Sequence, residues 1–418
     1  MTNAFNRIKN VRHHILTPIR AFLNDSRAIG VILISCTIIS LMLSNMDATQ
    51  AGFTSFFQHK LPVSAWLVHV PDTPLGWIND VLMTFFFFLV AMEIKRELTI
   101  GELASIKKSL LPVLAALGGM VCPAIIFAVF NNDTDFKHGW GIPMATDIAF
   151  SLGVLSLLGK KVPVQLKIFL AALAIIDDLG AIITIAIFYT SGLQLMYLFV
   201  ALGLVGVLIA LNRLKVTSTI FYIIPGAILW YCLFNSGIHP TISGVVVAFA
   251  MPLSQLEKLE RYLHYPVNFF IMPLFALANT AIVLPTQVGN IFTSTISFGV
   301  MLGLVAGKPV GIFIFSFFAT KTGIAALPGG TTYKQLLGIG MLGGIGFTMS
   351  IFTSTLAYSS DALQVISKVC VICASVVSSV AGFIYLTKLK PPTELIPRPK
   401  KVFKLPVVPV QVTEEDEG

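Results

Sequence analysis

Long apolar segments follow one another along nearly the whole chain, and this succession constrains the fold more than any other feature. Hydrophobic residues make up 56% of the 418 residues, charged residues make up only 11%, and the mean hydropathy is +0.85. Soluble domains carry roughly 25% charged residues, whereas a helix crosses a bilayer with about 20 apolar residues. The composition therefore predicts an all-α polytopic membrane protein rather than a soluble globular one.

Hydropathy gives twelve candidate transmembrane helices, and because some are short or interrupted it leaves the count open by one or two. They cover residues 28–46, 76–94, 109–131, 139–158, 165–189, 194–212, 218–234, 237–252, 265–284, 298–319, 335–357 and 364–387. We expect a basic cytoplasmic segment at 1–27, the twelve-span domain at 28–389, and a cytoplasmic tail at 390–418. The tail is rich in proline and ends in acidic residues, a composition typical of disorder.

The distribution of basic residues supports the count of twelve. With the N-terminus in the cytoplasm, 24 of the 28 lysines and arginines fall in cytoplasmic segments. Lys60, Lys137 and Lys368 fall on the opposite side, and Lys308 lies within a span. Cytoplasmic loops carry an excess of basic residues, and one span more or fewer would exchange the sides of all later loops. The asymmetry therefore favours twelve spans with both termini in the cytoplasm.

Four ionisable residues lie near the middle of predicted spans, where lipid disfavours charge. Asp177 and Asp178 occupy the centre of span 5 in A-L-A-I-I-D-D-L-G-A-I-I, Asp147 lies in span 4, and Lys308 lies in span 10. Each such residue costs about 2.5–3.5 kcal/mol at the centre of a span. A buried structural salt bridge is the simpler explanation, but such a bridge rarely needs three acids. The pattern instead indicates a pathway for ions or protons.

The two adjacent aspartates cannot share one orientation, because consecutive helix residues point about 100° apart. One can face an ion cavity while the other reaches toward another helix, where Lys308 is the obvious partner. Neighbouring carboxylates that are charged together repel each other, so at least one is expected to titrate near physiological pH. Such a carboxylate holds either a proton or a small cation, and the two would compete for it.

Residues that break helices occur at the same depth as these charges. Span 4 contains Gly139, Gly141 and Pro143 ahead of Asp147, and span 11 reads G-I-G-M-L-G-G-I-G-F-T-M-S. Spans 4 and 11 hold matching places in two three-span units, spans 3–5 and 10–12. This arrangement predicts inverted three-helix repeats with two broken, crossing helices. Asp147 would then neutralise exposed helix N-termini, and Lys308 exposed C-termini.

Five stretches of the chain carry a family likeness. They read A-L-A-I-I-D-D-L-G-A-I, I-P-M-A-T-D-I-A-F-S-L-G-V, G-K-P-V-G-I, G-G-I-G-F-T-M-S-I-F and W-I-N-D-V-L-M-T-F-F-F-F-L-V-A-M-E-I-K-R-E-L. Together they resemble the NhaA family of bacterial Na+/H+ antiporters, and the resemblance extends from about Asp25 to Leu389. It implies an electrogenic inner-membrane exchanger that extrudes Na+ or Li+ against entering protons, is activated at alkaline pH and needs no cofactor.

The resemblance also implies roles for individual residues. Asp178 matches the family's main cation ligand, and Asp177 matches the neighbour that pairs with the lysine at Lys308 and shares the metal-ion site. Asp147, with Thr146 beside it, matches the acid at the helix crossing. The residues that match pH-sensing or ion-path positions are Asp80, Glu93, Arg96, Glu97, Glu260 and His264.

Two further features follow from the resemblance. The outer segment 59–72 resembles the family's dimer contact, so a homodimer through this hairpin is expected. The chain departs from some members of the family at one position. Those members have a histidine directly after the residue equivalent to Glu260, whereas this chain has Arg261. This difference bears on the fine tuning of the pH response and not on the exchange itself.

Simpler explanations exist for several of these residues. Glu93, Arg96 and Glu97 lie where a span meets the cytoplasm, so a solvated cluster of charges explains them equally well. Asp80 lies within one turn of the outer interface, so it can be a solvated residue rather than a buried part of the ion path. We expect His239 to be a hydrogen-bonded interfacial histidine rather than a pH-responsive group.

Two threonines lie beside the predicted helix breaks. The hydroxyl group of a threonine can ligate a cation or bond its own helix. We expect the first role for Thr146 and the second for Thr348.

Two other functions can be weighed from the sequence. An intramembrane aspartyl protease needs two buried acids on different helices and a G-x-G-D element, which the chain lacks. A proton-coupled solute symporter is the nearer alternative. It would need aromatic or cationic groups deep in the site to hold the solute, and Lys308 is the only candidate.

Overall fold

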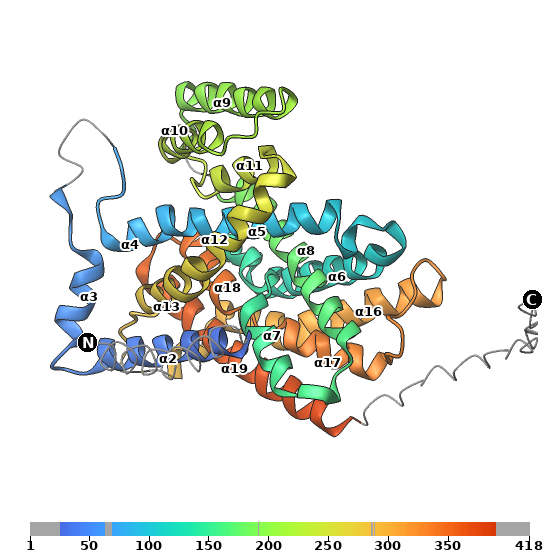
Figure 1. Ribbon diagram of the computed structural model, residues 1–418. Coiled ribbons are helices and arrows are strands. Elements are labelled where there is room, and N and C mark those ends of the chain that lie inside the picture. The colour runs from blue at the N-terminus through green and yellow to red at the C-terminus, as the bar shows by residue number, and fades with distance from the viewer. Residues whose placement is uncertain (1–25, 63–68, 191, 286, 288, 390–418) are drawn as a thin grey trace, which may run out of the picture.

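The computed structural model of the protein describes residues 26–62, 69–190, 192–285, 287 and 289–389 (Figure 1). These residues form helices joined by short connections, and no strand occurs among them. The all-α prediction is therefore confirmed for this part of the chain. The expected segment 1–27 and the expected tail 390–418 lie almost entirely outside the described residues.

Helices occupy each of the twelve expected segments. The first six contain α2 (Ser26–Asn45), the continuous rod of α4 (Pro74–Gly76), η2 (Trp77–Leu82) and α5 (Met83–Thr99), then α6 (Ile106–Asn131), η4 (Lys137–Met144) with α7 (Ile148–Leu157), α8 (Val164–Phe188) and α9 (Leu195–Arg213). The last six contain α10 (Ile220–Ser236), α11 (Ile242–Ala250), η6 (Val267–Ile271) with α13 (Met272–Asn279), α15 (Thr295–Leu302) with η7 (Gly303–Gly307) and α16 (Lys308–Lys321), α17 (Tyr333–Gly343) with α18 (Phe347–Ala357), and α19 (Asp361–Lys388).

The lengths of these helices decide how many spans the structure itself supports. Among the described residues, 8 helical segments are long and apolar enough to cross a membrane, and the bent pair α17 and α18 brings the number to 9. Of the remaining helices, α10 and α11 have 17 and 9 residues, short of the roughly 20 residues of a full crossing. α12 (Leu253–Pro266), η6 and α13 form one continuous helical run, residues 253–279, which is not among the segments that are long and apolar enough. The protein is thus a polytopic membrane protein, and the number of twelve remains a prediction.

Both predicted helix breaks are present, and they meet. The chain leaves helical conformation after Met144, between η4 and α7. Pro143, one residue earlier, cannot donate the backbone hydrogen bond that a helix requires. The glycine-rich segment bends by 46° between α17 and α18. The N–H of Asp147 in the first break donates to the C=O of Ile345 in the second at 2.7 Å. Segments nearly 200 residues apart in sequence are therefore joined at their irregular backbone.

Close helix packing surrounds the two breaks. α6 packs against α15 and α16, α8 packs against α6, and α17 and α19 complete this half. At the crossing of α6 and α16, a Cβ atom on Gly118 would lie 2.3 Å from the carbonyl oxygen of Gly311. Only glycine permits that approach, which is how small residues let membrane helices pack closely. α7 and α18 lie in the middle of the bundle (Figure 1).

A second group of helices is built around α5. α11 packs against α5, and α10 joins α11 to α9, which forms the outermost layer on that side (Figure 1). Lys95 near the end of α5 donates to the C=O of Phe249 at 2.7 Å and to that of Met251. These bonds satisfy the C-terminal end of α11. α2 packs against α13 and α7.

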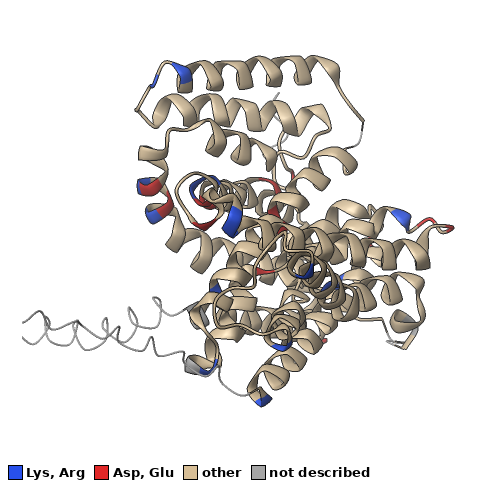
Figure 2. Cartoon of the chain, turned by 90° about the vertical axis from the view of Figure 1, so that its right-hand side faces the viewer, with Lys and Arg blue, Asp and Glu red and all other residues tan. Residues whose placement is uncertain are grey.

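Charged residues are rare inside the bundle, and a small group of them lies there (Figure 2). The buried charged side chains are Asp147, Asp177, Asp178, Lys308 and Lys368. Lys368, which the sorting of basic residues assigned to the outer side, lies two turns inside α19 and is only 6% exposed.

The connections contain helices that hydropathy did not reveal. α3 (Gln50–Gln58) lies in the long loop after α2, and α12 (Leu253–Pro266) precedes η6. Shorter helices are η3 (Glu102–Ala104), η5 (Gly159–Lys161) and α14 (Gly289–Thr293). Of the expected hairpin at 59–72, residues 63–68 lie outside the described residues. The N–H of Leu61 donates to the C=O of Asp72 at 2.7 Å and joins its two sides.

Candidate functional site

Asp147 connects the two broken helices. It caps the N-terminus of α7, where its Oδ1 accepts a hydrogen bond from the N–H of Phe150 at 2.9 Å. Its Oδ2 accepts from the N–H of Thr348 at 3.2 Å and from the Thr348 hydroxyl at 2.5 Å, at the start of α18. One buried carboxylate therefore faces the N-terminal ends of two half-helices, whose free N–H groups carry partial positive charge.

Asp177 faces away from the start of α18 and toward α16. Its Oδ2 lies 2.9 Å from Lys308 Nζ, and neither side chain is exposed to solvent. The Thr146 hydroxyl donates to the same oxygen and to the C=O of Gly343, both at 2.8 Å. Lys308 also donates to the C=O of Met144 at the end of η4. The lysine and the threonine thus join one carboxylate to the C-terminal ends of η4 and α17.

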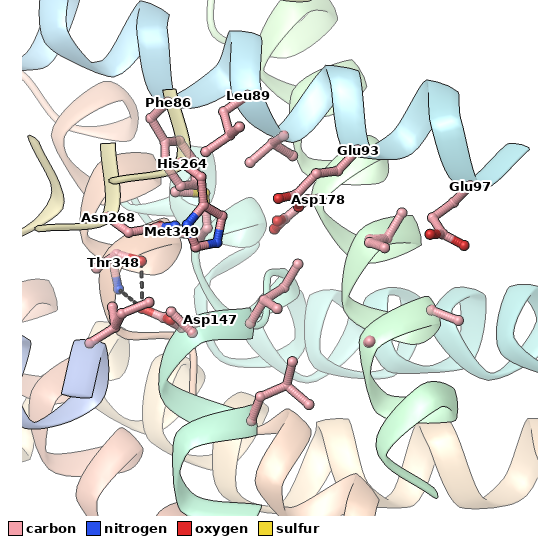
Figure 3. Close-up of a pocket in the computed structure, with 18 of the residues that line it drawn as sticks. Phe86, Leu89, Glu93, Glu97, Asp147, Asp178, His264, Asn268, Thr348 and Met349 are labelled. Carbon is pink, nitrogen blue, oxygen red and sulfur yellow. Dashed lines mark hydrogen bonds between the residues drawn. The ribbon is translucent and has the colours of Figure 1, made fainter. Parts of the chain in front are cut away.

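Asp178 lies about a third of a turn around α8 from its neighbour and lines a cavity instead. The cavity has a volume of about 430 Å³ and extends between α5, α7 and α8 (Figure 3). Asp147 and Thr348 line it as well. Asp178 is 3% exposed, and its Oδ1 has no hydrogen-bond partner among the described residues. A buried carboxylate oxygen without a partner is costly, so this atom is suited to bind an ion or a proton.

The charges in this region do not balance. Asp147, Asp177 and Asp178 are all buried, and Lys308 is the buried cation that the structure places beside them. Because a buried unpaired charge is expensive, the excess negative charge favours uptake of protons or of a small cation.

Asp177 and Asp178 differ in the groups that surround them. Within the described part of the chain, no group of three or more His, Cys, Asp and Glu side chains is arranged to hold a metal ion. Asp177 is occupied by Lys308 and Thr146, although its Oδ1 has no partner within the described residues. The Thr348 hydroxyl lines the same cavity as Asp178 and offers an oxygen of the kind that hard cations accept.

Charged residues of α5 and α12 meet at one end of the cavity. Arg96 forms ion pairs with Glu260 and, at 3.3 Å, with Glu97. Glu93, Arg96, Glu97 and His264 line the cavity, and Figure 3 shows Glu93 and Asp178 pointing toward one another. The structure thus joins residues about 160 positions apart into one cluster at the cavity's mouth.

Two members of this cluster lie on α12, outside the membrane-spanning helices. Burial raises the pKa of Glu260, Arg96 opposes that rise, and Glu97 and Glu257 add to it. Burial lowers the pKa of His264. Glu260 Oε2 is buried without a partner among the described residues. Glu260 therefore loses its proton at a higher pH, and His264 loses its proton at a lower pH, than an exposed group of the same kind.

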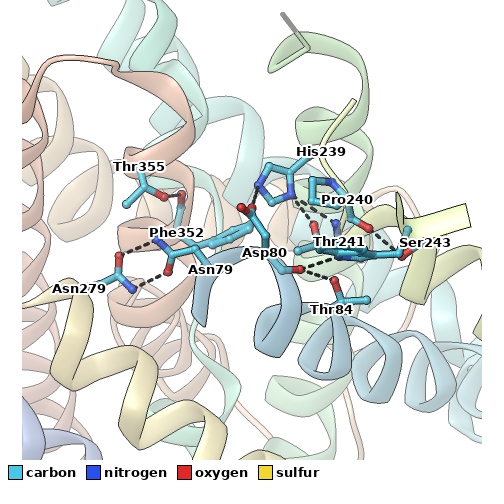
Figure 4. A network of polar contacts seen from close by, with 11 residues as sticks. Asn79, Asp80, Thr84, His239, Pro240, Thr241, Ser243, Asn279, Phe352 and Thr355 are labelled. Atoms are coloured by element: carbon cyan, nitrogen blue, oxygen red, sulfur yellow. Dashed lines mark hydrogen bonds and ion pairs between the residues drawn. The ribbon is translucent and has the colours of Figure 1, made fainter. Parts of the chain in front are cut away.

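Asp80 is not part of the cavity. It lies in η2, and its Oδ1 is 3.4 Å from His239 Nε2 (Figure 4). His239 Nδ1 lies 2.7 Å from the Thr241 hydroxyl. The expected hydrogen bonding of His239 is present, and its carboxylate partner was not foreseen. The structure therefore separates Asp80 from the other predicted site residues.

Thr348 is the residue that sequence reasoning misassigned. Its hydroxyl was expected to bond its own helix, and it donates instead to Asp147. Thr146 was expected to ligate a cation, and in this structure its hydroxyl donates to Asp177. The position of Thr348 directly after the glycine-rich break was the available signal, because residues in the first turn of a helix have no preceding carbonyl of that helix to bond.

Comparison with known proteins identifies the relatives of the chain. Residues 20–386 match the profile of the family described as Na+/H+ antiporter 1. A Na(+)/H(+) antiporter NhaA 2 of Flavobacterium johnsoniae is 49% identical over 373 residues, which cover 88% of this chain and 91% of the relative. NhaA antiporters of Flavobacterium psychrophilum and Klebsiella pneumoniae are 46% and 44% identical, over 88% and 90% of this chain and 95% and 98% of theirs.

Proposed function

Because this chain belongs to the Na+/H+ antiporter 1 family, we propose that it exchanges internal Na+ or Li+ for external protons across a bacterial inner membrane. The relatives of the chain are named as antiporters, so we propose transport for it and not enzymatic catalysis. The observation that carries the proposal is the excess of buried acid over buried base around the cavity.

Exchange follows from competition for Asp178. With the cavity open to the cytoplasm, Na+ sheds part of its water, binds the Asp178 carboxylate and displaces protons. Rearrangement at the α17–α18 and η4–α7 breaks then exposes the site to the outer side, where protons displace Na+. An empty, charged and occluded Asp178 would be an unpaired buried charge, which is strongly disfavoured. The carrier therefore reorients with cargo and not without it.

The neighbouring groups support this cycle. Asp147 stabilises the N-terminal ends of α7 and α18, and Lys308 stabilises the C-terminal end of η4 together with Asp177. When more protons enter than sodium ions leave, the exchange carries net charge. We propose that protons bound at Asp178 and at the Asp177–Lys308 pair supply this difference, which makes the exchange electrogenic.

We propose twelve spans with inverted three-helix repeats and both termini in the cytoplasm, since the basic residues are so strongly asymmetric. The matching breaks in η4–α7 and α17–α18 support the repeats. The cavity mouth at Arg96 then lies on the cytoplasmic side. A homodimer through the 59–72 hairpin is part of the same proposal.

The charged cluster of α5 and α12 at the cavity mouth is suited to control, as the pH changes, the access of ions to Asp178. As the pH rises through the raised pKa of Glu260, its carboxylate loses a proton and its attraction to Arg96 strengthens. This change links α12 to α5, whose Glu93 faces Asp178 (Figure 3). We propose that this link, with Glu97 and His264, activates exchange at alkaline pH, and that Asp80 belongs to the outer part of the ion path.

A direct test uses everted membrane vesicles that contain the protein and a pH-sensitive dye. Addition of Na+ or Li+ should move protons out of acidified vesicles, and K+ should not. Asp178→Asn should abolish this response while the protein still inserts, whereas Asp135→Asn, which changes an exposed acid, should leave it intact. A proton-coupled solute symporter would give no sodium-dependent pH change, and that result would reject the proposal.

A further inference from the structure

Phe352 of α18 contacts aromatic rings from three other segments. Its ring centroid lies 5.2 Å from that of Phe87 in α5, 5.2 Å from that of His239 ahead of α11, and 6.2 Å from that of Phe275 in α13. Phe352, Phe87 and Phe275 are at most 2% exposed. We call Phe352, Phe87 and Phe275 the aromatic collar. It joins α18 to the helices grouped around α5.

The collar lies between two polar regions. On one side Thr348, one helical turn before Phe352, bonds Asp147 and lines the cavity together with Met349. On the other side Asp80 pairs with His239, and His239 bonds Thr241. Figure 4 shows Phe352 against this second region. The two polar regions therefore approach α18 from opposite directions and are separated by aromatic rings.

The polar region beyond the collar is formed by residues of η2, of α13 and of the connection ahead of α11. Asn279 of α13 donates to Asn79 Oδ1 at 2.7 Å, and Asn79 precedes Asp80 in η2 (Figure 4). The side-chain oxygens of this polar region can replace water molecules around a cation that leaves the site. The collar itself offers no such oxygens, because its members are phenylalanines.

The space beside the collar is closely packed. Phe87, Ile182, Ile185 and Thr241 line a gap that has about 0 Å³ for a water molecule. Thr348 and Met349 line the cavity, and Phe352, which follows them on the same half-helix, does not. Narrow apolar regions of this kind oppose the passage of ions.

We propose that Phe352, with Phe87 and Phe275, is the barrier that closes the outer side of the transport site while the cavity is open to the cytoplasm. The inference rests on the proposed alternating access. Phe352 and Thr348 belong to the same half-helix, so a rearrangement at the α17–α18 break that moves the Asp147 contact also moves the collar. Withdrawal of Phe352 then connects the site to the region of Asn79, Asp80 and His239.

The test measures from which side a reporter thiol can be reached. Met349→Cys places a thiol at the cavity side of the collar, in the full-length chain with its five native cysteines replaced. A membrane-impermeant thiol reagent is applied to right-side-out vesicles and, separately, to everted vesicles. With the collar intact, labelling from the cytoplasmic side should be the faster of the two.

Phe352→Ala should speed labelling from the outer side by about tenfold, which corresponds to about 1.4 kcal/mol of barrier. Phe127→Ala is the matched control, because Phe127 is equally buried but packs in α6 away from the collar. It should leave the outer rate unchanged. Equal acceleration by both variants would mean general loosening and would overturn the proposal.

Phe352→Leu keeps the inference testable if Phe352→Ala fails to insert. Leucine retains apolar bulk but not the ring, so the outer rate should rise by a smaller factor. An unchanged outer rate in every inserted Phe352 variant overturns the barrier assignment. Sodium-dependent proton movement is measured in parallel in the unsubstituted protein. Its absence would reject the proposed exchange, whereas its presence with unchanged labelling would reject only the role of Phe352.

Discussion

Lys308 Nζ lies 2.9 Å from Asp177 Oδ2, with both side chains fully buried, and the same ammonium group donates to the C=O of Met144. A single lysine thus neutralises a carboxylate and a helix C-terminal end, which carries partial negative charge. Loss of the lysine leaves both without their partner. This relationship ties the stability of the crossing to the charge state of the site.

Lys308→Ala should therefore lower the thermal stability of the protein and alter the pH profile of exchange. Removing one partner of a buried pair costs about 3–5 kcal/mol. The melting temperature of the purified protein in detergent measures this cost. Lys321→Ala, at the exposed end of the same helix, is the control and should melt like the wild type.

A double variant separates the ion pair from general packing. Lys308→Met with Asp177→Leu removes both charges, and replacing both members of a buried pair by apolar residues is often neutral or stabilising. We expect it to melt at a higher temperature than Lys308→Met alone. A double variant that is no more stable than the single one would show that the pairing with Asp177 is not what Lys308 provides.

Thr348→Val should weaken sodium binding. The substitution keeps the shape of the side chain but removes the hydroxyl that donates to Asp147 at 2.5 Å. A buried acceptor that loses a donor costs about 1–3 kcal/mol, so the apparent affinity for Na+ should fall about tenfold or more. Thr353→Val is the control, because the Thr353 hydroxyl bonds only the C=O of Met349 in its own helix. Equal effects of the two variants would contradict the role of Thr348.

Glu260→Gln should shift activation of exchange to higher pH or flatten the pH profile. Burial raises the pKa of Glu260, and glutamine cannot gain the charge that strengthens the contact with Arg96 as the pH rises. Glu257→Gln should have a smaller effect in the opposite direction, since the Glu257 charge contributes to raising the pKa of Glu260. Initial exchange rates measured over a pH series decide this, and shifts of the same sign in both variants would contradict it.

The same residue predicts how stability depends on pH. A carboxyl group whose pKa is higher in the folded than in the unfolded protein contributes its full stabilisation below the unfolded pKa, about 4.3 for glutamate. It loses that contribution as the pH rises through the folded pKa. Glu260→Gln should therefore gain melting temperature relative to the wild type as the pH rises from about 4. A difference that is constant with pH would show that Glu260 titrates normally.

The sequence revealed those features whose cost in lipid is visible residue by residue. Asp147, Asp177, Asp178 and Lys308 stood out because a charge within a span is expensive wherever its partners lie. The breaks were visible because Pro143 and the clustered glycines of span 11 act locally on the backbone. The residues alone left open which aspartate takes the lysine, and the resemblance assigned it to Asp177. In the structure Asp177 pairs with Lys308, and Asp178 lines the cavity.

Long-range partners could not be read from the chain. Thr348 and Asp147 are 201 residues apart, and Arg96 and Glu260 are 164 residues apart. A hydroxyl group near its own carbonyls gives no local sign that it will bond elsewhere. α12 (Leu253–Pro266) is absent from the expected helices for a similar reason. It is amphipathic and short of a span, so a search for long apolar runs passes over it.

The central claim is that Na+ and protons compete for one site at Asp178, and proton release upon Na+ binding tests it most directly. Purified protein in weakly buffered detergent solution above neutral pH is mixed with NaCl while the pH and the bound Na+ are recorded. The wild type should bind Na+ and release protons together, and Asp178→Asn should do neither. Sodium binding without proton release by the wild type, or undiminished proton release by Asp178→Asn, would contradict the account.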